Sequence, residues 1–186
     1  MRIISGSKRG KKLAALEGGK VRPTTDRVKE SLFNILQFNI SGSSFVDLFA
    51  GSGQIGLEAL SRGADRGYFV ESSREAAGLI RQNILSTGFE DRAELFMGDY
   101  KSFFRQKQQE SFDIIYIDPP YYENMFLSAA ELSSMYVKPA GLIICEHPTT
   151  EELPQRIGEA IAGKSYRYGK IELTIYSRSP GLTESV

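Results

Sequence analysis

The residues best suited to chemistry follow a hydrophobic stretch near the middle of the chain. Residues 112–117 predict a buried strand, and Asp118, Pro119, Pro120 and Tyr121 come directly after it. Pro120 cannot donate to a sheet and restricts the residue before it, so the chain leaves the sheet here. Asp118 and the Pro119 carbonyl can accept the two N–H bonds of an exocyclic amine, and Tyr121 can stack on a flat base. The alternative is a plain strand followed by a Pro-Pro turn.

A second candidate site is the glycine-rich stretch that begins at Gly51 and has the spacing GxGxxG. It lies between a predicted strand, residues 45–50, and a predicted helix that ends at Gly63. Glycines let the backbone approach a ligand closely, and the first N–H groups of a helix point outward. Asp47, inside the strand, can support this turn or face an amino-acid-like cation. Glu71 ends the next predicted strand, residues 68–71, where it can accept from two ribose hydroxyls.

Dinucleotide-binding oxidoreductases have the same glycine spacing and an acid at the same distance. Two features argue against that class. Asp47 would repel a pyrophosphate, and the chain has a single His and no Lys motif suited to hydride transfer. S-adenosylmethionine fits better, with its methionine group near the glycine turn and its ribose on Glu71. A strand-turn-helix unit that binds no ligand is the remaining alternative.

Asp99 and Tyr100 follow a third predicted strand, residues 93–97. Asp99 can accept from an adenine amine with the Tyr100 ring beside it, or it can simply cap the predicted helix 100–108. The residues predicted to bind the cofactor are Asp47, Phe49, Gly51, Ser52, Gly53, Glu71, Asp99 and Tyr100.

The elements that must position these residues alternate along the chain. Helices are predicted at residues 26–38, from the Ser72 and Glu75 capping box to Gly88, at 123–136 and at 150–162. A strand is predicted at 142–146 and an antiparallel hairpin at 165–178. This order predicts an α/β fold with a doubly wound, mostly parallel seven-stranded sheet and one antiparallel strand. The glycine turn and Asp118 would then share one edge of the sheet.

Length and composition limit the class of protein. The 186 residues suit one domain, and a single Cys excludes a disulfide framework or a multi-thiolate zinc site. We expect no metal site, and we interpret Cys145 as a core residue and His147 as the end of a strand. No signal peptide and no apolar run of membrane length is found, so we expect a cytoplasmic protein without a membrane partner.

The net charge of zero hides an uneven distribution. Residues 1–29 carry nine basic and two acidic side chains, so the rest of the chain is acidic. A basic arm with glycines between its charges can follow a phosphate backbone, where counterion release drives association. The other interpretation is a solvated, frayed terminus. The residues predicted to contact a nucleic acid are Lys8, Arg9, Lys11, Lys12, Arg22 and Thr24.

These motifs together support a resemblance. Residues 47–53 with residues 118–121 resemble class I S-adenosylmethionine-dependent amino-methyltransferases, which have a Rossmann-like fold. Residues 22–34 and 56–64 are more narrowly similar to the bacterial 16S ribosomal RNA guanine-N2 methyltransferase D family. The likeness covers nearly the whole chain, and Gln54 departs from the small residue that is more frequent in the family. It divides the chain into a basic RNA-contacting extension (1–24), a methyltransferase domain (25–180) and a tail (181–186).

The resemblance implies methyl transfer from S-adenosylmethionine to the exocyclic N2 of a guanine in 16S ribosomal RNA. The substrate would be the small subunit or its late assembly intermediate, and the enzyme a monomer. Asp118, Pro119 and Tyr121 would be catalytic. Because adenine-N6 and cytosine-N4 enzymes share the Asp-Pro-Pro-Tyr motif, a nucleic-acid amino-methyltransferase of that kind is the alternative. A DNA adenine enzyme usually has a target-recognition segment, which is not inserted here, and a non-catalytic RNA-binding factor would be expected to lose part of the site.

Overall fold

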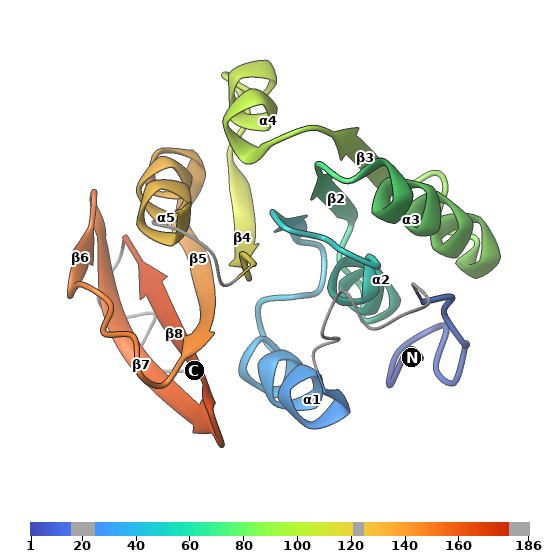
Figure 1. Cartoon of the computed structure of the whole chain (residues 1–186), viewed down its shortest axis with the longest axis horizontal. Helices are drawn as coiled ribbons and strands as arrows, with labels where there is room; N and C mark the ends of the chain where they lie inside the picture. The colour runs from blue at the N-terminus through green and yellow to red at the C-terminus, as the bar shows by residue number, and fades with distance from the viewer. Residues whose placement is uncertain (16–24, 121–124, 179–186) are drawn as a thin grey trace.

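The structure is a computed structural model that describes residues 1–15, 25–120 and 125–178, and its helices and strands alternate along most of the chain (Figure 1). The helices are α1 (Asp26–Ile35), α2 (Gln54–Ser61), α3 (Arg74–Thr87), α4 (Tyr100–Gln106) and α5 (Met125–Tyr136). The strands are β1 (Ser44–Asp47), β2 (Arg66–Glu71), β3 (Ala93–Met97), β4 (Phe112–Ile117), β5 (Val137–Pro148), β6 (Arg156–Ile157), β7 (Ala160–Tyr168) and β8 (Ile171–Ser177).

All strands of the described residues form one sheet in the order β3-β2-β1-β4-β5-β8-β7-β6. The first five strands in this order pair in parallel, β8 is antiparallel to β5, and β7 is antiparallel to β8. The predicted doubly wound, mostly parallel sheet is therefore confirmed, with β8 as its reversed strand. The sheet has an eighth strand beyond the predicted seven, the two-residue β6, which pairs with β7.

Helices cover both faces of the sheet. Residues of α1 and α2 pack on β1, β4, β5 and β8 on one face, and α3 packs beside them on β2. On the other face, α4 and α5 pack on the same central strands. The carboxyl ends of β1, β2, β4 and β5 thus open between two helical layers, where ligands bind in open α/β sheets.

Local capping explains where several helices begin. Thr25 accepts from the N–H of Val28 and begins α1, which ends at Ile35 and not near residue 38 as predicted. The Ser73 hydroxyl oxygen accepts from the N–H of Ala76, so Ser73 caps α3 in place of the predicted Ser72. Boundary differences of this size are normal, because helix ends fray.

The helix predicted for residues 150–162 is wrong, because this stretch contains β6 and the start of β7. Pro154 lacks an N–H, and Gly158 turns the chain with a φ of 56°. A Cβ at Gly158 would also lie 2.2 Å from the hydroxyl oxygen of Ser134 on α5. Ile157 and Ala160 are buried in the core beside α5, so tertiary packing favours a hairpin over the helix.

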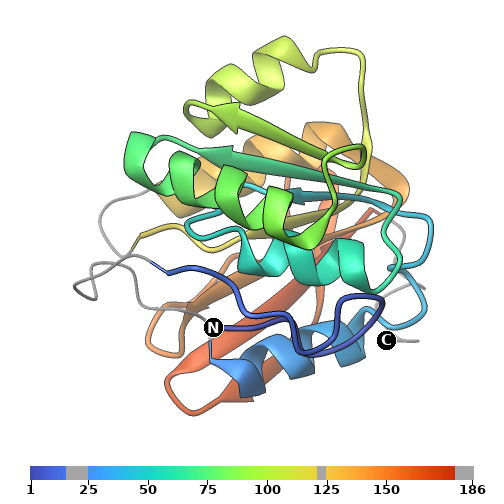
Figure 2. The same cartoon turned by 90° about the vertical axis from the view of Figure 1, so that its right-hand side faces the viewer.

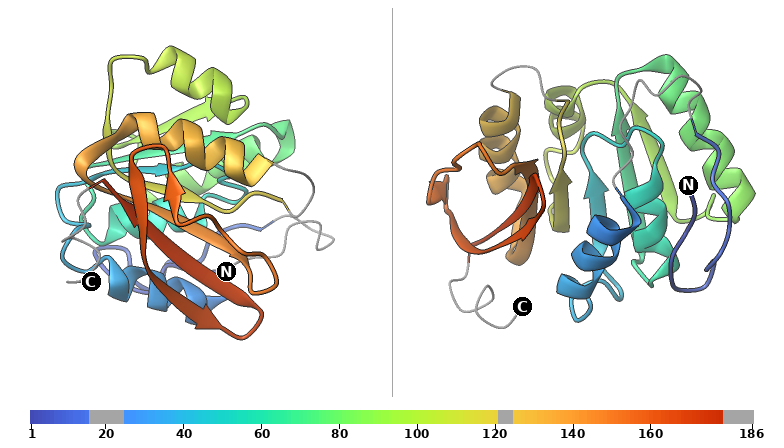
Figure 3. Two further views of the ribbon diagram at one scale, coloured as in Figure 1. Left: turned by 90° about the vertical axis from the view of Figure 1, so that its left-hand side faces the viewer. Right: turned by 60° about the horizontal axis from the view of Figure 1, so that its bottom comes forward.

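The N-terminal segment, defined here as residues 1–15, packs on the domain (Figure 3, right). Its two halves meet at an antiparallel bridge between Arg2 and Lys12, and Ile3 and Leu13 are buried beside α2 and α3. The fully buried Glu58 of α2 accepts from the N–H groups of Ile4 and Ser5, at 2.7 and 3.0 Å. Further bonds join the segment to Lys29, Ser61 and Asn83. These contacts fix its backbone while its basic side chains stay exposed.

None of the helices that the structure describes is long and apolar enough to cross a membrane.

Candidate active site

Asp118 lies directly after β4, at the carboxyl end of the sheet. The parallel register pairs Ile117 with Cys145 of β5, so the next residues, Asp118 and Glu146, are neighbours. Asp118 and Pro119 are partly exposed and Pro120 is exposed at this edge. The third predicted catalytic residue, Tyr121, lies outside the described residues.

The surroundings of Asp118 raise the affinity of its carboxylate for a proton. Burial raises the pKa of Asp118 well above its ordinary value, and the charges of Glu146 and Asp47 raise it further. A carboxyl group of this kind is a stronger base than an exposed aspartate once it is ionised. Perturbed carboxyl groups of this type are concentrated at functional sites.

Tyr116 and Glu146 belong to the same cluster, although no motif in the sequence indicates them. The Tyr116 hydroxyl donates to the Glu146 carboxylate at 2.5 Å, and both side chains are buried. Burial, followed by the charges of Asp118, Glu146 and Asp47, raises the pKa of Tyr116. From the sequence alone, the only signal is a glutamate near the end of a hydrophobic strand, and it becomes meaningful only through the pairing of β5 with β4.

The glycine turn connects β1 to α2 as predicted. Gly51 and Gly53 have φ angles of 54° and 77°, which favour glycine, and Gly53 is the N-cap of α2. Gly56 allows close packing, since a Cβ there would lie 2.3 Å from the Phe69 ring of β2. The hydroxyl group of Ser52 contacts the Met1 sulfur at 3.1 Å.

Asp47 is buried beneath this turn. It accepts from the N–H of Gly56 at 3.3 Å, so it supports the turn in the way predicted for one of its two roles. Burial raises the pKa of Asp47 to about 7, and the charges of Glu71 and Glu146 raise it while the N–H groups of Gly56 and Phe49 lower it.

Glu71 lies at the end of β2, beside the first glycine. Its two carboxylate oxygens accept from the N–H of Gly51 at 2.8 Å and of Ser73 at 2.7 Å. The side chain is partly exposed, and a carboxylate has about four acceptor positions, so it can accept further hydroxyl groups.

Asp99 and Tyr100 take different positions at the end of β3. Asp99 is exposed and accepts from the N–H of Ser102 at 2.7 Å, so it caps α4, and this bond lowers its pKa. Tyr100 is 5% exposed, and its hydroxyl group is 2.8 Å from that of Ser128 on α5. Its ring packs against the partly exposed Phe49, with centroids 5.7 Å apart. Tyr100 therefore supports Phe49 from the core.

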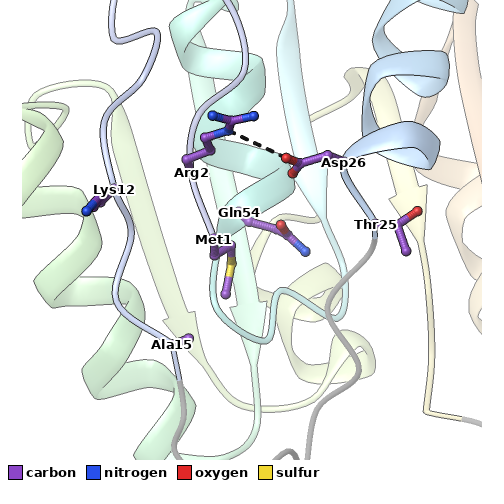
Figure 4. A pocket seen from close by; sticks show the side chains of 7 residues that line it. All are labelled: Met1, Arg2, Lys12, Ala15, Thr25, Asp26 and Gln54. Carbon is purple, nitrogen blue, oxygen red and sulfur yellow. Dashed lines mark ion pairs between the residues drawn. The ribbon is translucent and has the colours of Figure 1, made fainter.

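A cavity of about 480 Å³ lies next to the glycine turn. It is lined by Met1, Arg2, Lys12, Ala15, Thr25, Asp26 and Gln54. Figure 4 shows Gln54 between Met1 and Thr25, with Arg2 and Asp26 facing each other. The Arg2 guanidinium lies 3.5 Å from the Asp26 carboxylate. The cavity thus joins the N-terminal segment, the start of α1 and the start of α2.

The predicted RNA-contacting residues of the N-terminal segment are distributed along α2. Lys12 lines the cavity near the start of α2, whereas the N–H of Lys8 bonds to Ser61 at the end of that helix. Figure 2 shows the turn of residues 5–10 on the side of the molecule opposite the end of β4. Lys8, Arg9, Lys11 and Lys12 are all exposed, and the other two predicted contacts, Arg22 and Thr24, lie outside the described residues.

Comparisons with known proteins agree with this arrangement. Residues 1–177 match the family described as Conserved hypothetical protein 95. The ribosomal RNA small subunit methyltransferase D of Haemophilus influenzae is 39% identical over 150 residues, which cover 78% of each chain. The solved structure of the Escherichia coli protein yhhF has a TM-score of 0.84 and 30% identity, over 95% of this chain and 96% of that one.

A more distant structure defines the fold class. The O-methyltransferase of Bacillus cereus in complex with SAH has a TM-score of 0.67 at 16% identity, over 84% of this chain and 83% of that one, which shows the fold alone. The sheet order and the glycine turn agree with this fold, and the family match covers nearly the whole chain. The chain therefore belongs to the ribosomal RNA small subunit methyltransferase D family and has the fold of S-adenosylmethionine-dependent methyltransferases.

Proposed function

We propose that this protein transfers a methyl group from S-adenosylmethionine to the exocyclic N2 amine of a guanine in 16S ribosomal RNA. The observation that carries the proposal is the position of Asp118 and the Pro119 carbonyl at the end of β4, one strand away from the glycine turn of β1. The relative from Haemophilus influenzae is named for the small ribosomal subunit, and this suggests the same class of RNA and a cytoplasmic location here.

The residues around the glycine turn fit the cofactor. Glu71 retains acceptor positions for ribose hydroxyls, and the exposed Asp99 carboxylate can accept from an adenine amine in addition to capping α4. The partly exposed Phe49 offers an apolar surface for the cofactor. The turn itself, with Ser52 and the cavity beside it, would receive the methionine group. When bound, S-adenosylmethionine supplies a methyl group activated by its sulfonium charge.

Asp118 and the Pro119 carbonyl would make the exocyclic amine of guanine a better nucleophile. The N2 lone pair of guanine is delocalised into the ring, so the amine is a poor nucleophile. When Asp118 and the Pro119 carbonyl accept its two N–H bonds, the nitrogen is held in a pyramidal geometry with its lone pair directed out of the ring. Positive charge then develops on the nitrogen, and the Asp118 carboxylate stabilises it.

The target base must leave its stack to reach Asp118. Tyr121 would fix the plane of the unstacked base, and the basic N-terminal segment would contact the RNA backbone, which positions the enzyme without specifying a sequence. These two roles, and the division into an extension (1–24), a domain (25–180) and a tail (181–186), are parts of the proposal. An adenine-N6 or cytosine-N4 amine would fit the same two acceptors, so the identity of the base has to be measured.

The test is methylation of small subunits from a strain that lacks this protein, with the product nucleoside mapped by mass. We expect N2-methylguanine at one position in 16S RNA. Asp118→Ala should lower the rate about 100-fold or more, because it removes the group that stabilises the developing charge. The dissociation constant of S-adenosylhomocysteine should change little, since Asp118 is assigned to the base and not to the cofactor.

Asp113 provides a matched control on the same strand. It lies at the opposite end of β4, where it bonds to Ser44 and forms an ion pair with Lys138 at 2.8 Å. Asp113→Asn should therefore keep most of the rate. A methylated adenine or cytosine in the product would replace the guanine assignment, and an Asp118→Ala variant that kept most of its rate would contradict the role of Asp118.

A further inference from the structure

We propose that Glu146 is a positioning residue of this site: held by the Tyr116 hydroxyl, it places a second negative charge beside Asp118 and so helps Asp118 take the proton that leaves the methylated amine. This inference rests on the proposed function. It deepens that function by assigning a role to Glu146 and Tyr116, which lie outside the Asp-Pro-Pro-Tyr and glycine motifs.

The sheet brings the relevant groups together on one face. Parallel pairing places Asp47 of β1 beside Tyr116 of β4, and Tyr116 beside Ile144 of β5. Paired residues of a sheet point to the same face, and side chains alternate along each strand. Glu146, two residues after Ile144, therefore lies on the face of Tyr116 and Asp47, and Asp118 follows Tyr116 by the same spacing.

The contact between Tyr116 and Glu146 fixes the second carboxylate. The hydroxyl donates to the carboxylate at 2.5 Å, and Tyr116 is 1% and Glu146 is 7% exposed. A buried tyrosine hydroxyl that donates to a carboxylate stabilises its ionised form. Burial also weakens solvent screening, so the charge of Glu146 acts strongly on its neighbours.

The charged groups that face this position come from several elements. Tyr116 and Asp118 come from β4 and Asp47 from β1, while Glu71 at the end of β2 acts on Asp47. On the other side, β8 pairs Glu146 with Leu173, which carries no charge. The neighbouring His147 lies on the opposite face and bonds to Thr174 at 2.9 Å. The groups described around Asp118 are thus dominated by acids.

Such surroundings suit the second half of the reaction. The N2 lone pair forms the new N–C bond while the C–S bond of the donor breaks and its electron pair remains on sulfur. The nitrogen is then positively charged and carries one proton too many. Asp118 takes this proton, its pKa being raised by burial and by the charge of Glu146, and releases it to solvent when the product leaves. An isolated surface aspartate would hold the proton more weakly.

The test follows the protonation of Asp118 directly. The protein is labelled with ¹³C at the aspartate carboxyl carbons, and the Asp118 signal is identified by its loss in Asp118→Asn. In Glu146→Gln, which keeps the shape and removes the charge, the midpoint of the Asp118 titration should move to lower pH. The acid limb of the methyl-transfer rate should move in the same direction and the plateau rate should fall, whereas the dissociation constant of S-adenosylhomocysteine should stay within about two-fold.

Two further variants make the experiment specific. Tyr116→Phe removes the hydroxyl that stabilises the Glu146 charge, so it should move the Asp118 midpoint in the same direction by a smaller amount. If Glu146→Gln does not fold, Tyr116→Phe provides the test of the inference instead. Glu172→Gln is the matched control, because Glu172 is one strand away on the opposite face and forms an ion pair with Arg167 at 3.3 Å. It should leave the midpoint unchanged.

An Asp118 midpoint that is the same in the parent and in a folded Glu146→Gln, or a folded Tyr116→Phe, would overturn the inference. The titration requires neither RNA nor donor, so this failure is distinct from a failure of the proposed function. The parent protein could methylate no RNA while its Asp118 midpoint still moves in Glu146→Gln. Glu146 and Tyr116 would then have no role in catalysis. If the parent methylates guanine but the Asp118 midpoint does not move in Glu146→Gln, only the role assigned to Glu146 is contradicted.

Discussion

At the scale of single residues, the clearest consequence of the site's construction is the cost of burying Asp47. Its pKa rises from an ordinary value of 3.8 to about 7, mainly through burial. The native state therefore binds a proton that the unfolded state releases between these two values, so the free energy of unfolding falls as the pH rises through this range. Deprotonated Asp47 is the less stable form of the folded protein.

We therefore expect Asp47→Asn to flatten the dependence of stability on pH. Between pH 5 and pH 8 the parent should lose roughly 2–3 kcal/mol more of its unfolding free energy than the variant, because asparagine has no charge to bury. Urea denaturation at the two pH values measures this difference.

Asp99→Asn is the control for this measurement. The pKa of Asp99 is lowered by the N–H of Ser102, so the stability it contributes is lost only on acidification below its ordinary range. Its variant should differ from the parent by the same amount at pH 5 and pH 8. Parallel pH profiles for the parent and Asp47→Asn would show that Asp47 titrates normally.

The candidate residues that occur in motifs can be selected from the sequence alone. The spacing to glycines and prolines predicts Asp47, Glu71 and Asp118. The first two end their strands, and Asp118 directly follows β4. Glu146 and Tyr116 could not be found in this way. Their meaning depends on the register between β4 and β5, and one residue of slip would move Glu146 to the other face.

At the scale of elements, local signals determined the first part of the chain and tertiary contacts determined the last part. Capping residues and apolar spacing predict α1 and α3, the preceding glycine turn predicts α2, and Asp99 as a cap predicts α4. The sequence predicts a helix where β6 and β7 form a hairpin. Its apolar residues Ile157 and Ala160 are buried against α5, a contact that the local sequence does not reveal. Propensity is a weak prior when packing of this kind decides.

The packing of the N-terminal segment on α2 gives a prediction at the same scale. Glu58 accepts from two backbone N–H groups and from the Nε of Arg62, all while fully buried. Glu58→Gln turns one acceptor into a donor and removes the charge. We expect a loss of about 2–3 kcal/mol in unfolding free energy. Amide exchange at Ile4 and Ser5 should become faster than in the rest of the protein.

Urea denaturation and amide hydrogen exchange together check this result. Glu75→Gln, an exposed change in the first turn of α3, should stay within about 0.5 kcal/mol of the parent. Because Met1, Arg2 and Lys12 line the cavity beside the glycine turn, Glu58→Gln should also weaken cofactor binding. Unchanged exchange at Ile4 and Ser5 would mean that the apolar contacts of Ile3 and Leu13 suffice to hold the segment.

At the scale of the whole molecule, the basic residues near the N-terminus lie on a segment that packs along one helix. The backbone of the N-terminal segment follows α2, whose eight residues span about 12 Å, from Lys12 at the cavity to Lys8, whose N–H bonds to Ser61 at the end of the helix. The composition predicted a basic arm, and the structure shows that residues 1–15 have a fixed backbone. An ordered row of charges can contact several consecutive phosphates without first losing chain entropy.

RNA binding should therefore depend on both ends of this row. Replacing Lys8, Arg9, Lys11 and Lys12 by glutamine should weaken binding to small subunits and reduce the slope of log K against log salt by roughly one for each charge removed. The pairs Lys8/Arg9 and Lys11/Lys12 should each account for about half, because each pair carries two of the four charges removed. Lys101/Arg105, exposed on α4 across the sheet, is the matched control and should leave the slope unaltered. A slope that changes only with Lys11/Lys12 would confine the RNA to the side of the cavity, and a slope unaltered in the fourfold variant would exclude the N-terminal segment from the RNA interface.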